Sequence, residues 1–228
     1  MEYQENGDVH MILFIYGASG AAIEIYDLAE RVNALSRRYS KIYLIDDFEE
    51  ESSYYGTDRI HFSSCETVAT EDFEFIIAVG EPSARAFLLK RIEENGYKLA
   101  TLIDPSAMVS STARIAPGCI VNAQSIVSSK VIMEKNCFLG FHVVVGHDAH
   151  LKKNTVVCPM ATVGGGSIVG ENTFIGLNSS MKEHVNLGDN VVIGMGSMVF
   201  RSVEDGCTVL GNPARVTKGN DDHKVFRN

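Results

Sequence analysis

Large aliphatic residues recur at every sixth position from Val109 to Val199, without a change of phase. Counted in units of six from Val109, the first place is always Val, Ile, Leu or Met, and the fifth is always small or β-branched. Only 45% of the residues are hydrophobic, so an unbroken series of this length at a fixed spacing is very improbable by chance. Such strict self-similarity is typical of a solenoid. The first-place residues are Val109, Ile115, Val121, Val127, Met133, Leu139, Val145, Leu151, Val157, Val163, Val169, Ile175, Met181, Leu187, Ile193 and Val199.

A period of six fits neither an α-helix nor a half-buried strand alone. It fits a short strand followed by a turn, with one large side chain pointing inward per strand. Three such strands complete a coil of about 18 residues, and coils stack about 4.8 Å apart into a prism of about five coils. Glycine often holds the second place, where we expect it to permit tight bends. These glycines are Gly140, Gly146, Gly164, Gly170, Gly176, Gly188 and Gly194.

The first hundred residues instead alternate short apolar runs with helical periodicity. Strands are predicted at residues 11–16, 41–45, 73–79 and 99–103, and amphipathic helices at 21–37 and 81–95. This order indicates a small, parallel α/β sheet of Rossmann-like type. Asp104-Pro105 is a natural boundary before the repeats.

Bulk properties narrow the function. The chain has 228 residues and a net charge of −9, which argues against a nucleic-acid or anionic-membrane surface. No run approaches the roughly 18 apolar residues of a membrane span, and the polar N-terminus does not resemble a signal peptide. The five cysteines form no CxxC pair and are expected to be reduced thiols of a cytoplasmic protein.

Two turns in the first domain carry candidate binding groups. Gly17-Ala18-Ser19-Gly20 lies between a strand and a helix, where backbone N–H groups favour a phosphate. Asp46-Asp47 closes the second strand, where acidic groups commonly hold a ribose hydroxyl or an amine. Taken alone, the first motif is as consistent with a plain turn, and the second with a solvated strand end. About ninety residues also hold only half of a dinucleotide fold.

The order of the motifs is more specific than any one of them. GASG follows the first strand, DD the second and AVG the third, Asp104-Pro105 leads into the hexapeptides, and Gly211-Asn212-Pro213-Ala214-Arg215 closes the chain's repeats. This arrangement resembles the NeuD-like sugar O- or N-acetyltransferases, and within them the PglD-type nucleotide-amino-sugar N-acetyltransferases. The expected layout is an N-terminal extension (1–10), a Rossmann-like nucleotide-sugar-binding domain (11–104), a left-handed β-helix for acetyl-CoA binding and catalysis (105–216) and a tail (217–228).

The resemblance implies an acetyl-CoA-dependent homotrimer, with active sites between neighbouring prisms, no metal, and a nucleotide-linked amino sugar as acceptor. His147 would be the general base and Asp148 would orient it. Acetyl-CoA would meet Val156, Gly165, Leu177, Met195 and Arg215, with the Gly165 N–H near the thioester oxygen. The nucleotide sugar would meet Ser19, Gly20, Ala21, Asp46, Asp47 and Gly80.

Three positions depart from the family pattern. Related enzymes often carry histidine where this chain has Ala21, and another histidine where it has Val156. Met195 stands where glycine is usual. The first departure concerns recognition of the sugar or base, and the other two concern packing against the pantetheine arm.

The chemistry suits His147. Acetyl transfer from a thioester to an amine requires loss of a proton from the amine, a donor for the oxyanion and correct positioning. An imidazole with an ordinary pKa of about 6.5 serves the first requirement near neutral pH. His142, His150 and His184 are more simply interpreted as surface or subunit-packing residues, and Cys158 as structural.

Rival functions remain open from the sequence. O-acetylation of a sialic-acid-type sugar is the nearest, because the residues do not separate amine from hydroxyl acceptors. A zinc enzyme of the γ carbonic anhydrase type would use His142 and His147, five residues apart, but the expected third ligand position is Ser106. A non-catalytic nucleotide-sugar-binding scaffold is the third alternative.

Overall fold

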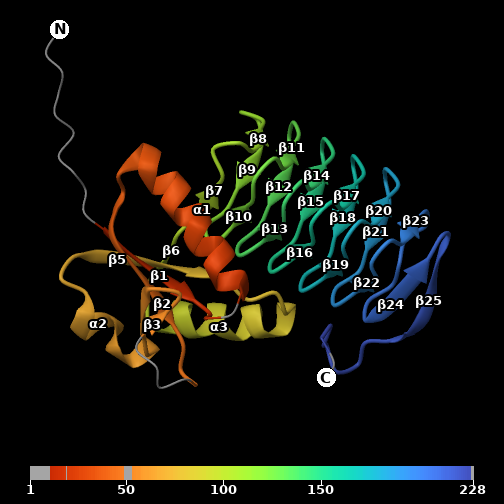
Figure 1. Cartoon of the computed structure of the whole chain (residues 1–228). Coiled ribbons are helices and arrows are strands. Elements are labelled where there is room, and N and C mark those ends of the chain that lie inside the picture. Colours follow the sequence, from red (N-terminus) through yellow and green to blue (C-terminus); the bar gives the residue numbers. More distant parts are fainter. Residues whose placement is uncertain (1–10, 19, 49–52, 227–228) are drawn as a thin grey trace, which may run out of the picture.

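The computed structural model describes residues 11–18, 20–48 and 53–226, so the N-terminal extension lies outside the described residues. The first part of the chain forms one sheet in the order β3-β4-β2-β1-β5-β6, parallel except for the β3–β4 pair (Figure 1). Its elements are β1 (Met11–Tyr16), α1 (Gly20–Ser36), β2 (Tyr39–Ile45), β3 (Ser53–Tyr54), β4 (Thr57–Ile60), η1 (Phe62–Ser64), α2 (Cys65–Val68), β5 (Asp72–Ile77), α3 (Pro82–Glu94) and β6 (Lys98–Leu99).

The Rossmann-like class is confirmed, because apolar β1 and β5 lie at the centre of this sheet between two packed layers. Leu13 and Ile15 face the side of α1, whereas Phe14 packs with Phe75 and Leu89 on the side of α3. The segment between β2 and β5 was not predicted to contain regular structure. It holds β3, β4, η1 and α2, which are too short to show a hydrophobic period.

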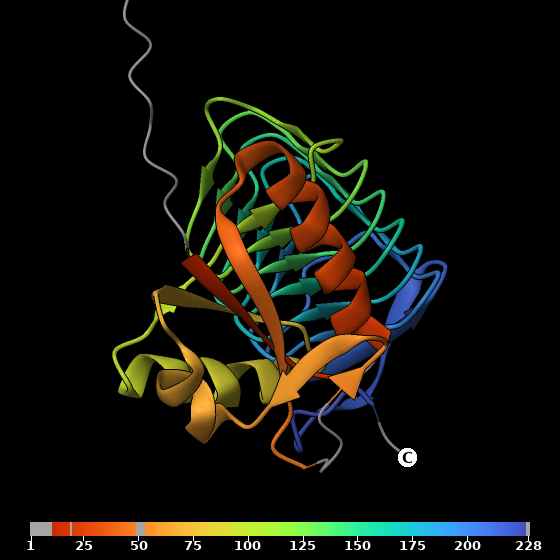
Figure 2. The same cartoon turned by 60° about the vertical axis from the view of Figure 1, so that its left-hand side comes forward.

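The second part is the expected left-handed parallel β-helix, with three flat faces along the prism (Figures 1 and 2). From β7 to β20, each strand pairs in parallel with the strand 18 residues later, as Val121 does with Leu139, whereas the final pair, β24 and β25, is antiparallel. Face 1 contains β7 (Leu102–Ile103), β10 (Ile120–Val121), β13 (Phe138–Leu139), β16 (Val156–Val157), β19 (Phe174–Ile175), β22 (Val192–Ile193), β24 (Cys207–Gly211) and β25 (Ala214–Gly219). Face 2 contains β8 (Met108–Val109), β11 (Ile126–Val127), β14 (Val144–Val145), β17 (Thr162–Val163), β20 (Ser180–Met181) and β23 (Met198–Val199). Face 3 contains β9 (Arg114–Ile115), β12 (Ile132–Met133), β15 (His150–Leu151), β18 (Ile168–Val169) and β21 (Asn186–Leu187).

The prism interior is built from the two places that the repeat singled out. First-place residues such as Val145, Leu151 and Val157 are the second residues of their strands and are fully buried. Fifth-place residues such as Val143 and Ala161 are buried beside them in one continuous apolar cluster. Because each large side chain is covered only by neighbouring coils, the array is stabilised by stacking.

The expected reason for the second-place glycines is wrong. The left-handed backbone conformation occurs instead at every fourth place from Gly118 to Gly196, where the non-glycine residues have φ between +53° and +62°. Asparagine, which tolerates this conformation, often fills the place. The second-place glycines are needed for close stacking, since a Cβ on Gly176 would lie 2.6 Å from the Ile193 carbonyl oxygen in the next coil.

The two parts of the chain join without a linker. The single strand predicted at residues 99–103 is in fact divided, because Leu99 ends β6 in the first sheet and Leu102 begins β7 on face 1. Leu102 and Ile120 of face 1 belong to the same buried cluster as Leu28 of α1. Figure 2 shows α1 lying across the prism.

A buried arginine ties the two parts together. The Arg85 guanidinium of α3 is fully buried and donates to the Ile77 and Val79 carbonyls at the end of β5, 2.8 and 3.0 Å away. It also donates to the Asn136 carbonyl at 2.9 Å and to its side-chain oxygen at 2.7 Å, in a bend of the prism. Burial lowers the pKa of Arg85 to about 10, so the group stays charged at neutral pH.

The chain ends by returning to the first domain. After β25 it is anchored at Asn220, which is buried and donates to the Asn190 carbonyl at 3.1 Å. The following residues reach Glu81, which precedes α3, and Figure 1 shows this segment turning back from β25 below the prism. No helix among the described residues is long and apolar enough to cross a membrane.

Candidate functional site

His147 and Asp148 lie together on an outward bend between β14 and β15, at the edge where faces 2 and 3 meet. This edge, with Gly165 one coil further on, is called the His147 corner. The His147 Nδ1 atom lies 2.9 Å from Asp148 Oδ2, and the two side chains are 67% and 52% exposed. Asp148 occupies a left-handed bend position, φ +58°, which turns its carboxylate back onto the imidazole.

The electrostatics of this pair favour an ionised carboxylate. The hydrogen bond with His147 lowers the pKa of Asp148, and the nearby charge of Lys130, with its Nζ 3.9 Å from Asp148 Oδ1, acts in the same direction against desolvation. With Nδ1 donating to Asp148, the His147 Nε2 atom carries the lone pair and is directed away from the carboxylate. Sequence reasoning had not included Lys130, which precedes Asp148 by one coil of 18 residues.

Glycines make room for the imidazole. A Cβ built on Gly165 would lie 2.9 Å from His147 Nε2 and 3.0 Å from Cε1, so the ring edge occupies the space of that missing side chain. A Cβ on Gly166 would lie 2.5 Å from Nδ1 of His184, one coil further on. His184 therefore shares the His147 corner, although no feature of the sequence distinguishes it from other surface histidines.

The Gly165 amide is available as a donor. Its carbonyl accepts from His184 N at 2.9 Å, but its N–H donates to no other residue among those that the structure describes. A Cβ on Gly146 would lie 2.5 Å from the Gly165 nitrogen and would cover it. The Gly146-His147 step therefore leaves a free N–H beside the imidazole.

The other expected acetyl-CoA contacts lie elsewhere on the same prism. Leu177 and Met195 are exposed on the edge where faces 1 and 2 meet, called the Leu177 corner. Arg215 is exposed on β25 and donates to the adjacent Ala214 carbonyl at 2.8 Å. Val156 is 1% exposed on face 1, so it offers no surface to a ligand in this chain. Its direct contact with acetyl-CoA is not supported, because the packing of face 1 covers it.

The expected nucleotide-sugar residues gather at the carboxyl edge of the first sheet. Gly17 follows β1 and donates to the Ile45 carbonyl at 3.0 Å, while Gly20 and Ala21 form the start of α1. Gly80 follows β5, next to β1 in the sheet. Ser19 lies outside the described residues. This edge is where ligands bind in open α/β sheets.

Asp46 and Asp47 have different partners at this edge. Asp46 accepts the Phe48 N–H at 2.9 Å and lies 3.6 Å from an Arg59 nitrogen. Asp47 accepts from the Tyr16 hydroxyl at 2.6 Å, from the Phe62 N–H at 2.9 Å and from Arg91. Burial raises the pKa of Asp47, but these three donors and the Arg91 charge outweigh it, so the pKa is lowered. Asp47 therefore stabilises its own loop. The sequence does not reveal this role, because the three donors come from distant positions in the chain.

The remaining candidate residues have surroundings that indicate a structural and not a catalytic role. His150 Nε2 lies 2.7 Å from Glu134 Oε1 on face 3. Burial raises the pKa of Cys158 to about 12, which leaves its thiol protonated near neutral pH. His142 lies on an exposed bend of the Leu177 corner rather than beside His147. No three His, Cys, Asp or Glu side chains of the described residues are grouped as metal ligands.

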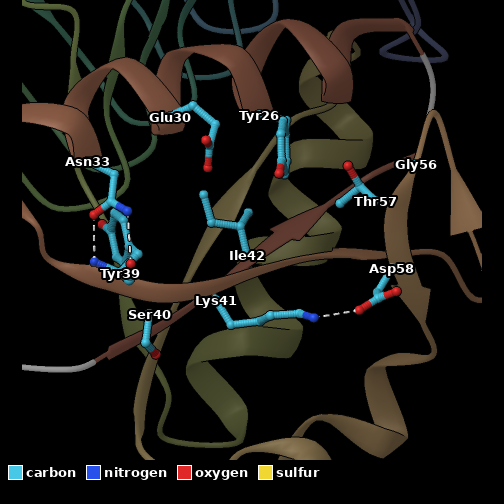
Figure 3. A pocket seen from close by; sticks show the side chains of 10 residues that line it. All are labelled: Tyr26, Glu30, Asn33, Tyr39, Ser40, Lys41, Ile42, Gly56, Thr57 and Asp58. Atoms are coloured by element: carbon cyan, nitrogen blue, oxygen red, sulfur yellow. Dashed lines mark hydrogen bonds and ion pairs between the residues drawn. The ribbon is translucent and has the colours of Figure 1, made fainter.

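A cavity of about 310 Å³ lies away from all these residues, between α1, β2 and β4 (Figure 3). Its polar groups are largely paired with each other, since Lys41 Nζ lies 2.7 Å from Asp58 Oδ2 and the Asn33 side chain bonds both backbone groups of Tyr39. None of the predicted site residues lines it. We therefore place the candidate site at the His147 corner and the carboxyl edge of the sheet.

Comparison with known proteins matches both parts of the chain. The family model described as the PglD N-terminal domain covers residues 12–92, and that described as the hexapeptide repeat of succinyl-transferase covers residues 166–201. The acetyltransferase domain of PglB from Neisseria gonorrhoeae FA1090 is similar, with 27% identity, a TM-score of 0.84, and coverage of 90% of this chain and 99% of that one. Another structure of that domain contains acetyl coenzyme A.

Two further structures share the fold at lower identity. WeeI from Acinetobacter baumannii AYE has 23% identity and a TM-score of 0.85, covering 91% of this chain and 100% of that one. PerB from Caulobacter crescentus, in complex with CoA and GDP-perosamine, has 22% identity and a TM-score of 0.80, covering 90% and 97%. One chain thus combines a match to the PglD N-terminal domain with a match to the hexapeptide repeat, and its fold is that of the similar PglB acetyltransferase domain.

Proposed function

We propose that this enzyme transfers the acetyl group of acetyl-CoA to the amino group of a nucleotide-linked 4-amino sugar, with His147 as general base. The observation that carries the proposal is the exposed His147–Asp148 pair, 2.9 Å apart, beside the free N–H of Gly165. The acetyl-CoA complex of the similar PglB domain supports the donor, and the complex of PerB with GDP-perosamine supports the class of acceptor.

The step at His147 is direct transfer in a ternary complex. The amine nitrogen of the sugar attacks the thioester carbonyl carbon, forming the N–C bond, and His147 Nε2 takes a proton from that nitrogen. Collapse of the tetrahedral intermediate breaks the C–S bond, and the proton passes to the departing CoA thiolate. Asp148 keeps the proton on Nδ1, which leaves Nε2 free to accept, and stabilises the imidazolium that forms.

The Gly165 N–H supports the developing oxyanion. Since this N–H makes no bond to other described residues, it can donate to the thioester oxygen without breaking an existing contact. A fixed backbone donor at the point of charge development is worth roughly 100- to 1,000-fold in rate in acyl transfer. Its position one coil from His147 brings the base and the donor to the same reacting carbonyl.

A second copy of the chain completes the site in this proposal. The His147 corner and the Leu177 corner are different edges of one prism, so a single ligand reaches both only where two prisms meet side by side. Leu177 and Met195 are apolar and exposed, which suits the pantetheine arm of acetyl-CoA. A homotrimer places the His147 corner of one copy against the Leu177 corner of the next at three equivalent clefts.

The carboxyl edge of the first sheet holds the nucleotide sugar. The diphosphate lies at the start of α1, near Gly17 and Gly20, where N–H groups and the helix dipole favour an anion. Asp46 is the better candidate for the nucleoside hydroxyls, because the Asp47 carboxylate is already engaged by three donors.

The test replaces His147 by asparagine and measures acetylation of a panel of UDP-, dTDP- and GDP-linked 4-amino sugars. The turnover number should fall about 100- to 10,000-fold, while CoA binding, measured by calorimetry, stays unchanged. His223→Asn is the control, since His223 is exposed like His147 and asparagine tolerates the left-handed conformation that His223 adopts. Full activity of His147→Asn would rule out His147 as the general base. A wild-type enzyme that acetylates hydroxyl acceptors but no amine would instead establish O-acetylation.

A further inference from the structure

The C-terminal tail returns to the sheet edge that we assign to the nucleotide sugar. This segment leaves β25 at Gly219 and is held at Asn220, whose N–H donates to the Gly206 carbonyl at 2.6 Å and whose side chain donates to Asn190. From this anchor the chain has only five residues to reach Phe226, so the tail is constrained at both ends of its course.

Glu81 fixes the far end of the tail. Its carboxylate accepts the Val225 N–H at 3.0 Å and the Phe226 N–H at 3.0 Å. Glu81 precedes α3 at the N-cap position, yet its side chain makes no capping bond to that helix. The carboxylate next to the expected sugar-binding residue Gly80 is therefore used to hold the tail.

The Phe226 ring is held but not buried. It contacts the Phe174 ring of face 1 edge to face, with centroids 5.6 Å apart and planes at 84°. Its Cε2 atom lies 3.6 Å from the place a Cβ would occupy on Gly80. Phe226 is nevertheless 60% exposed, so a large part of the ring faces open space where the first sheet and the prism meet. An ordered, exposed aromatic ring in such a position offers a flat apolar surface to a ligand.

We infer that Phe226 is a specificity-determining residue of the acceptor site, which contacts the apolar face of the sugar ring; this rests on the proposed function. The order of the strands indicates on which side of the nucleoside the sugar lies. In this fold the nucleoside hydroxyls lie at the end of the second strand and the diphosphate at the first helix. β5 is on the other side of β1 from β2, so Gly80 and Phe226 are on the side to which the sugar extends.

The position of Phe226 also fits the path of the acceptor. The sugar has to pass from the diphosphate site toward the prism, where the thioester is bound. Phe226 packs against Phe174 on face 1, and its ring lies beside Gly80 of the first domain, where it borders the space that a Cβ on Gly80 would occupy. A ring in this place can orient the sugar so that its amine is directed to the reacting carbonyl.

Phe226→Ala tests the inference, with Phe226→Tyr as the conservative variant and Phe87→Ala as the matched control. Phe87 is a similarly exposed phenylalanine on α3. Phe226→Ala should raise the KM of the nucleotide 4-amino sugar about tenfold, leave the KM of acetyl-CoA unchanged and leave the affinity for the free nucleoside diphosphate unchanged. Tyrosine should restore the KM, and Phe87→Ala should behave like wild type.

Glu81→Ala provides a second measurement, because it releases the tail without removing the ring. It should raise the same KM and speed amide hydrogen exchange at Val225 and Phe226. An unchanged sugar KM in Phe226→Ala, or an equal loss of affinity for sugar nucleotide and free nucleotide, overturns the inference while leaving the acetyltransferase intact. A wild-type enzyme that neither binds nor acetylates any nucleotide 4-amino sugar of the panel overturns the proposed function instead.

Discussion

The His147 imidazole occupies the space that a side chain on Gly165 would need: a Cβ there would lie 2.9 Å from Nε2. Gly165→Ala should therefore push the ring away from its position while leaving the prism folded. Because a shift of about 1 Å in a catalytic group costs roughly 100-fold, we expect the turnover number to fall about 100-fold. Steady-state kinetics and a melting temperature within a few degrees of wild type check this.

The same substitution in a His147→Asn background separates this cause from general damage. If alanine acts through the imidazole, it lowers the turnover number of wild type but hardly changes that of His147→Asn. Additive losses in the double variant would show that Gly165 acts apart from His147, for example through its own N–H.

Asp148→Asn should retain the bend and remove the charge, since asparagine tolerates the left-handed conformation that Asp148 adopts. The amide can no longer stabilise the imidazolium, so we expect the turnover number to fall roughly tenfold with the KM values unchanged. Asp148→Ala adds backbone strain and should in addition lower the melting temperature. A fully active Asp148→Asn enzyme would contradict the proposal that the Asp148 charge stabilises the imidazolium.

Asp47 should contribute to stability in a pH-dependent way. Its pKa is lower in the folded protein than in the unfolded chain, so its stabilisation is present above the ordinary aspartate pKa of about 3.9 and disappears as the pH falls through the folded value. Asp47→Asn should lower the free energy of unfolding by about 1–3 kcal/mol at pH 7. Urea denaturation should show this difference shrinking below about pH 4. A constant difference at all pH values would contradict the linkage.

Complementation tests whether two copies build one site. His147→Asn and Met195→Glu should each be nearly inactive alone, the second because its carboxylate lies against the donor and repels the CoA phosphates. Coexpressed, the two variants should form mixed trimers in which about a quarter of the clefts combine an intact His147 with an intact Met195. Activity near that fraction of wild type is expected. No recovery, in mixed assemblies confirmed by mass spectrometry, would place the whole site within one chain.

The architecture was readable from the sequence because it depends on repetition. One large residue per six positions fixes the strand, the inward direction and the coil, and neither an α-helix nor a half-buried strand alone satisfies the series from Val109 to Val199. The reason for the glycines was less readable. Sequence alone does not distinguish a glycine that adopts a left-handed backbone, such as Gly118, from one whose side chain would collide with the next coil, such as Gly176.

The candidate site was only partly readable for a related reason. His147 and Asp148 are adjacent in the chain, so their contact follows from local geometry. Contacts between distant segments left no such signal: nothing links Asp47 to Arg91, or Glu81 to Phe226, until the chain has folded. Val156 directly precedes a first-place residue, as the exposed Ile126 and Ile168 do in their strands. Only the packing of face 1 reveals that Val156 is covered.

The Arg85 guanidinium also restricts how the enzyme can move. Rotation of the first domain away from the prism would separate this cation from both oxygens of Asn136 and leave two of its buried N–H donations unmade, which is costly. The two domains should consequently melt in a single calorimetric transition and act as one body during turnover. In the proposed reaction, the distance between acceptor and donor is then set when the chain folds, and any adjustment to sugars of different length has to come from short segments around the site.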